Sequence, residues 1–129
     1  MIKLKTTFIA VFILSAILLA SCAASSSPAE AVSAYWEAMV AKDKAQLSAL
    51  SCSDYEAEAL TTMESFGAFE PVLSNLECSV LETSGDSATV QCGGTIEVSY
   101  GAEVLKIDLS ERNYAVEKES GDWRMCGTK

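Results

Sequence analysis

Four cysteines in the second part of the chain are the residues whose chemistry is easiest to anticipate. Cys52, Cys78, Cys92 and Cys126 are even in number, and no two of them are closer than 14 residues. Structural zinc sites usually take two cysteines from one short motif, often together with histidine, whereas this chain has neither Cys-x-x-Cys nor any histidine. We therefore predict two disulfides and no metal site, which places the domain outside the reducing cytoplasm.

Catalytic chemistry has weaker candidates. Asp108 and Glu111 could form a carboxylate pair for acid–base work or bind calcium, but both lie in a charged, turn-rich stretch where solvated surface is the more frequent role. The sequence contains no glycine-rich phosphate loop, nucleophile elbow or metal-binding helix motif. We predict no catalytic residue and no cofactor.

Aromatic and other large apolar side chains could line a cavity for an apolar ligand. These candidates are Tyr35, Trp36, Met39, Tyr100, Tyr114 and Trp123. Core packing is the favoured alternative, because a helix that covers a sheet buries such residues simply to remove their surface from water.

An export signal precedes these candidates. The apolar run from Phe8 to Leu19 follows Lys3 and Lys5. Twelve residues are too few to span a bilayer, which takes about 20, but they match the central region of a secretory signal peptide.

Leu19-Ala20-Ser21-Cys22, at the end of this run, resembles the lipobox of bacterial lipoproteins. In that family the cysteine receives a diacylglyceryl group and becomes the first residue after cleavage. The resemblance implies a signal peptide at residues 1–21, a lipidated Cys22 in a tether of residues 22–27, and a single domain at residues 28–129. An ordinary signal peptide followed by a chance cysteine is the alternative.

The charge of the remaining chain excludes some partners. The whole chain has a net charge of −9, and both signal-peptide charges are lysines, so 7 basic and 18 acidic residues remain, a net charge of −11. Nucleic acids and anionic lipid headgroups attract basic proteins. We therefore expect no nucleic-acid partner, and membrane attachment through the lipid alone.

The first half of the domain has helical signals. Ser27-Pro28-Ala29-Glu30 combines an N-cap, a first-turn proline and a capping box, and apolar residues then follow at helical spacing up to Val40. Weaker capping patterns begin at Asp43 and at Ser53. Pro71 marks the end of the helical part.

After Pro71 the apolar residues alternate, which is typical of strands. Ser84-Gly85-Asp86 predicts a turn, Gly93-Gly94 a bulge or bend, and a shift of the alternation near residues 110–113 an irregularity. We predict an α+β domain in which N-terminal helices pack on a curved, antiparallel, four-stranded meander sheet.

Two stretches carry a resemblance to a known superfamily. Ala31 to Asp43 is similar to the opening helix of nuclear transport factor 2-like (NTF2-like) domains, and Tyr114 to Arg124 looks like their closing hairpin. The resemblance implies a cone-shaped sheet with a cavity at its wide end. Dehydratase-type members use a His–Asp pair, which has no counterpart here, and no motif places the carboxylate and tyrosine of isomerase-like members.

The disulfide pairing can be argued from the hairpin. If the turn is centred near Gly85, Cys78 lies opposite Cys92, close enough to bridge at a non-hydrogen-bonded position. Cys52 then pairs with Cys126. The alternative is Cys52–Cys78 with Cys92–Cys126, because a slip of one residue would turn one hairpin cysteine to the other face.

Three functions remain open. The favoured one is a lipid-anchored, extracytoplasmic module that binds an apolar small molecule or an envelope protein without catalysis. An isomerase-like enzyme would need a buried carboxylate with a shifted pKa in the cone cavity. A structural envelope component would have a cavity filled by side chains.

Overall fold

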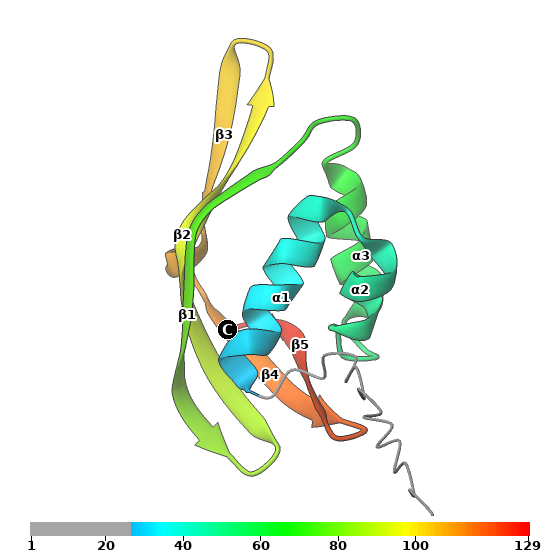
Figure 1. Ribbon diagram of the computed structural model, residues 1–129, viewed down its shortest axis with the longest axis vertical. Coiled ribbons are helices and arrows are strands. Elements are labelled where there is room, and N and C mark those ends of the chain that lie inside the picture. Colours follow the sequence, from blue (N-terminus) through cyan, green and yellow to red (C-terminus); the bar gives the residue numbers. More distant parts are fainter. Residues whose placement is uncertain (1–26) are drawn as a thin grey trace, which may run out of the picture.

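The computed structural model describes residues 27–129. The predicted signal peptide, the Leu19–Cys22 sequence and the lipidation site at Cys22 lie outside the described residues. Three helices are followed by an antiparallel sheet, and the predicted α+β architecture is confirmed. Figure 1 shows the helices together on one side of the curved sheet. None of the helices within residues 27–129 is long and apolar enough to cross a membrane.

The helical layer consists of α1 (Pro28–Ala41), α2 (Lys44–Ala49) and α3 (Glu56–Ser65). α1 begins as predicted, with the Ser27 hydroxyl accepting a hydrogen bond from the Glu30 amide at 3.2 Å. It ends at Lys42, which adopts a left-handed conformation and donates from Nζ to the carbonyls of Gly67 and Phe69, at 2.8 and 2.7 Å. This contact ties the end of α1 to the connection between α3 and the sheet.

The start of α3 differs from the prediction. Ser53 is not its cap, because the helix begins at Glu56 after Tyr55, whose side chain makes no capping hydrogen bond. The Ser53 amide and hydroxyl instead donate to the Glu119 carboxylate, with a shortest distance of 2.7 Å. The polar residue that resembled a helix cap joins the helical layer to the sheet.

The sheet contains β1 (Val72–Ser84), β2 (Ser87–Tyr100), β3 (Glu103–Asp108), β4 (Asn113–Glu119) and β5 (Asp122–Thr128). It has five strands rather than four, because the short helix η1 (Leu109–Glu111) interrupts the third. β3 pairs with the second half of β2 and β4 with its first half. Because β3 and β4 pair with successive parts of the same strand, β2, together they correspond to the single third strand of the predicted meander.

The predicted bulge lies where β1 faces Gly93-Gly94, but the extra residue belongs to β1. Ser74 pairs with Thr95 and Glu77 with Gly93, so three steps along β1 match two along β2. Asn75, between them, has a φ of 56°. The strand bends at this point.

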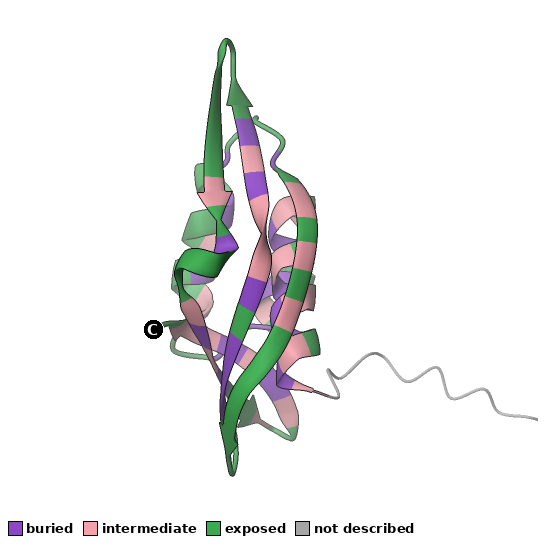
Figure 2. Cartoon of the chain, turned by 90° about the vertical axis from the view of Figure 1, so that its left-hand side faces the viewer, coloured by how far each residue is buried: buried purple, intermediate pink, exposed green. Residues whose placement is uncertain are grey.

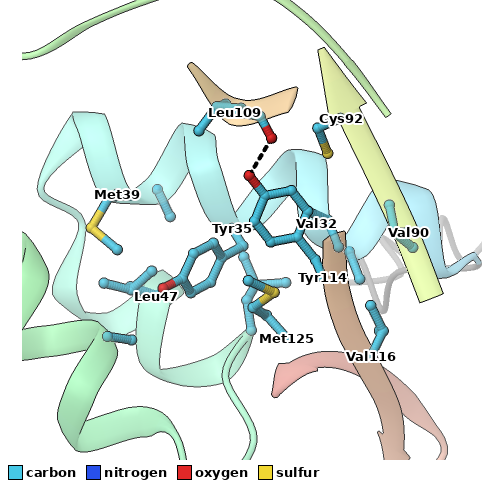
Figure 3. Close-up of a cluster of buried hydrophobic side chains, with 14 of the residues drawn as sticks. Val32, Tyr35, Met39, Leu47, Val90, Cys92, Leu109, Tyr114, Val116 and Met125 are labelled. Atoms are coloured by element: carbon cyan, nitrogen blue, oxygen red, sulfur yellow. Dashed lines mark hydrogen bonds between the residues drawn. The ribbon is translucent and has the colours of Figure 1, made fainter. Parts of the chain in front are cut away.

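The core lies between α1 and the sheet. Its largest fully buried side chains include Tyr35, Met39, Leu47, Ile96 and Met125. Figure 3 shows Val32 of α1 beside Tyr114 and Val90, and Tyr35 and Met39 on the side of Leu47 of α2. In Figure 2 the buried positions run along the middle strands, whereas β1 is largely exposed.

Two disulfides close the domain. Cys78–Cys92 joins β1 to β2 at directly opposite positions, with Cα atoms 4.0 Å apart, and Cys52–Cys126 joins the α2–α3 connection to β5, with Cα atoms 4.9 Å apart. This is the pairing that the hairpin argument favoured. Loops of 14 and 74 residues correspond to about 3 and about 4 kcal/mol in the chain-entropy model. Within residues 27–129 the helices and the sheet share one hydrophobic core, and both bonds join segments that pack around it.

Candidate ligand pocket

A pocket of about 420 Å³ opens where the β3–η1–β4 segment faces the helices. Trp36 from α1 and Tyr55 at the start of α3 line it from the helical side. Ile107 of β3, Leu109 of η1 and Tyr114 of β4 line it from the opposite side. The break in the third strand thus lies at the pocket, with η1 residues Leu109 and Glu111 among those that line it.

The aromatic residues at the pocket pack edge to face. The ring centroids of Trp36 and Tyr114 are 5.6 Å apart with planes at 71°, and those of Trp36 and Tyr35 are 5.1 Å apart at 83°. The Tyr114 hydroxyl donates to the Leu109 carbonyl at 2.6 Å (Figure 3). This bond fixes the Tyr114 ring and holds η1 against β4.

The indole N–H of Trp36 is buried and has no hydrogen-bond partner among the described residues. An unpaired buried donor costs about 1–3 kcal/mol, and buried tryptophan normally finds an acceptor. A phenylalanine would fill a purely structural position without this cost. The choice of tryptophan therefore favours a role for the residue beyond packing.

Charged side chains surround the pocket. Glu58, Asp108 and Glu111 supply carboxylates, and Lys106 and Arg112 supply cations. Lys106 is already paired, with its Nζ 3.2 Å from an oxygen of Glu97.

Asp108 is a cap rather than a base. Its Oδ1 accepts hydrogen bonds from the amide and hydroxyl of Ser110, at 2.9 and 2.6 Å. These bonds hold the pKa of the Asp108 carboxyl below its ordinary value. A carboxylate stabilised in its charged form takes up a proton less readily, so it is a poorer general base.

The two buried tyrosines stay neutral. Burial raises the pKa of Tyr114 to about 12 and that of Tyr35 further still. Near neutral pH neither is a phenolate: Tyr114 lies at the pocket and donates to Leu109, and Tyr35 lies in the core.

The structure separates the six predicted cavity residues. Trp36 and Tyr114 line the pocket, whereas Tyr35 and Met39 are core residues without exposed surface to offer a ligand. The other two, Tyr100 and Trp123, lie elsewhere: Tyr100 packs on Phe69 at 4.3 Å, and Trp123 carries the Lys118 ammonium over its ring at 5.1 Å.

Sequence reasoning missed Tyr55, Glu58 and Arg112 as pocket residues. Tyr55 and Glu58 lay within a pattern interpreted only as a helix start, and Arg112 lay in the predicted irregularity. Asp108 and Glu111 are solvent-exposed, as the favoured alternative stated, but they line the rim of the pocket.

Metal binding has one geometric candidate among the described residues. A ligand atom each of Cys52, Glu117 and Cys126 lies within 4.8 Å of the others. The two cysteines are bonded to each other, however, and a disulfide provides no thiolate ligand.

Comparisons with known proteins extend the structural picture. No protein-family model matches the sequence, and no curated protein matches it. Solved structures do. RPA3114, a SEC-C motif containing protein from Rhodopseudomonas palustris, is 15% identical with a TM-score of 0.55, covering 80% of this chain and 77% of that one.

Two Streptomyces proteins have similar structures. A candidate dehydratase of the NTF2-like family from Streptomyces avermitilis is 14% identical with a TM-score of 0.52, covering 74% of this chain and 86% of that one. Aln2 from another Streptomyces strain is 15% identical with a TM-score of 0.52, covering 74% of this chain and 80% of that one. Likenesses at this identity concern the fold alone, and they support the predicted NTF2-like architecture.

Proposed function

We propose that this protein is a lipid-anchored, extracytoplasmic domain that binds a small molecule without chemically changing it. The Leu19–Cys22 sequence supports the anchor, since it resembles a lipobox at the end of a secretory signal. The two disulfides indicate a non-cytoplasmic environment.

The aromatic pocket is the observation that carries the binding function. It has about 420 Å³ of space, within the range of small-molecule sites, and combines apolar walls with a charged rim. Trp36, which lines the pocket, also has a buried indole N–H without a partner among the described residues. A cavity filled by side chains, as a purely structural component would have, does not match this space.

Catalysis is less well supported by the same residues. An isomerase-like reaction would use a carboxyl group whose pKa burial has raised. Asp108, Glu58 and Glu111 are all exposed, and the pKa of Asp108 is lowered. The chain also lacks the histidine that dehydratase-type chemistry would use.

Binding can be tested with the neutral fluorescent probe N-phenyl-1-naphthylamine and purified residues 27–129. We expect saturable enhancement of the probe at one site per molecule. Trp36→Ala should weaken it at least about tenfold, as loss of a central aromatic contact does. Tyr100→Ala removes an aromatic ring outside the pocket and should bind like wild type. Failure of the probe to bind, or equal effects of both variants, would overturn the proposal.

A further inference from the structure

The charge around the pocket favours a cationic ligand. Three carboxylates face two basic side chains, and one of these, Lys106, is engaged by Glu97. The whole chain carries a net charge of −9. A cleft with an excess of negative side chains raises the local concentration of positively charged ligands.

The aromatic walls suit a cation for a second reason. Tyr114 is buried at the pocket, while Trp36 and Tyr55 are half-buried. Ring faces carry negative electrostatic potential, and tryptophan gives the strongest cation–π attraction. Because Tyr114 is buried and meets the Trp36 ring edge to face, the ring surface open to a ligand comes from Trp36 and Tyr55.

From this combination we infer that the pocket binds an organic cation with an alkylated ammonium head. The inference rests on the proposed binding function and names its ligand class. The ammonium group lies against Trp36 and Tyr55, with Glu111 and Glu58 supplying opposite charge. The pocket is larger than a trimethylammonium group, so an apolar body extends along Ile107 and Leu109.

The test compares choline with 3,3-dimethylbutan-1-ol, which has the same shape but carbon in place of the charged nitrogen. Residues 27–129 labelled with ¹⁵N contain two indole N–H groups, those of Trp36 and Trp123. Trp123 lies outside the pocket and serves as an internal control. We expect choline to shift the Trp36 indole peak saturably and to bind at least about tenfold more tightly than the alcohol.

A pair of charge variants tests the rim. Glu111→Gln should weaken choline binding about two- to threefold, the effect of one partly screened charge, and leave the alcohol unaffected. Glu64→Gln removes an exposed carboxylate of α3 that does not line the pocket. This variant should bind both choline and the alcohol like wild type. Equal effects of the two variants on choline would contradict the assignment.

The source of the ammonium group is distinguished by a second titration with phosphatidylcholine vesicles. Saturation by free choline supports a soluble ligand, whereas a Trp36 response to vesicles alone supports a lipid headgroup. If the alcohol binds as tightly as choline, or neither cation source moves the Trp36 peak, the cation assignment is wrong. Binding of the neutral probe would then still support the pocket as a small-molecule site.

Discussion

At the scale of single residues, Trp36 and Tyr114 make opposite contributions although they touch each other. The Tyr114 hydroxyl has a partner in the Leu109 carbonyl at 2.6 Å, while the Trp36 N–H has none among the described residues. The Tyr114 hydroxyl therefore stabilises the folded domain. The other polar group, the indole N–H, is buried without a hydrogen bond to the described residues and so contributes a cost to the folded state.

This contrast predicts the outcome of two conservative replacements. Tyr114→Phe should lower the free energy of unfolding by about 1–2 kcal/mol, because it leaves the Leu109 carbonyl without its donor. Trp36→Phe should cost less than about 1 kcal/mol, because the loss of packing is offset by removing an unpaired donor. Urea denaturation of both variants measures the difference, and a larger loss for Trp36→Phe would show that the indole N–H is paired.

The candidate residues could be anticipated only in part from the sequence, for a reason visible at Tyr35 and Trp36. Both belong to the apolar stripe of α1, and the period of the helix predicts that both face the sheet. Which of the two meets packed core and which meets open pocket depends on η1, whose position follows from tertiary structure. Tyr55 and Arg112 lie in connections that have no period, so nothing in the sequence directs them to the pocket.

At the scale of elements, the bend between β1 and β2 depends on one backbone position. Gly94 has a φ of +112°, and a Cβ atom there would lie 2.9 Å from the Ser74 carbonyl oxygen. It lies inside β2, between Gly93 and Thr95. The glycine is therefore required by the close approach of β1, not by a turn.

Gly94→Ala should accordingly destabilise the domain by about 2 kcal/mol or more, since it adds both a steric overlap with backbone and a disfavoured φ. Gly85→Ala is the matched control: φ is +57°, but a Cβ there would meet nothing within 4 Å. We expect about 1 kcal/mol for that turn variant. Thermal and urea unfolding compare the two, and equal losses would contradict the account of the bend.

The link between Ser53 and Glu119 predicts a pH dependence. Hydrogen bonds from the Ser53 hydroxyl and amide hold the pKa of Glu119 below its ordinary value of 4.5. A lowered carboxyl pKa stabilises the folded state above the unfolded pKa, and this contribution disappears as the pH falls through the folded pKa. Between neutral pH and acid, wild type should therefore lose more stability than Ser53→Ala.

The control for this measurement is Ser110→Ala, which relieves the pKa of Asp108, also lowered by a neighbouring serine. It reports how much of the acid sensitivity arises at the pocket rim. If Ser53→Ala loses as much stability as wild type between neutral and acid pH, the hydrogen bonds between Ser53 and Glu119 do not contribute to the acid sensitivity.

Elements were easier to predict than their interruptions. The cap of α1, the turn at Gly85 and the opposition of Cys78 and Cys92 all follow from local patterns and period. The sheet has five strands rather than four because Asp108 caps a helical turn in the middle of a strand. Ser53 resembled a helix cap in sequence, but its partner is 66 residues away.

At the scale of the whole molecule, the proposed anchor determines where an acidic domain can stay. The part after residue 21 carries a net charge of −11, which repels anionic membrane surfaces. Two acyl chains on one cysteine would overcome this repulsion, at about 0.8 kcal/mol per buried CH₂ group.

Cys22→Ser therefore should move the protein out of the washed membrane fraction or leave its signal uncleaved. Wild type should stay with membranes through a high-salt wash, because its attachment is apolar and not ionic. Cell fractionation with mass determination of the mature N-terminus checks both points. Wild-type protein found wholly soluble outside the cell would contradict the anchor.

The Cys52–Cys126 bond encloses nearly all of the sheet and α3 in one covalent ring. A protease that cuts the β2–β3 hairpin near Gly101, which projects beyond the helices in Figure 1, opens the ring without releasing a fragment. The nicked polypeptide should run as one band on a gel without reductant and as two bands with it. If the protein meets proteases outside the cytoplasm, as the proposed anchor implies, a cut in this projecting hairpin would leave the pocket assembled.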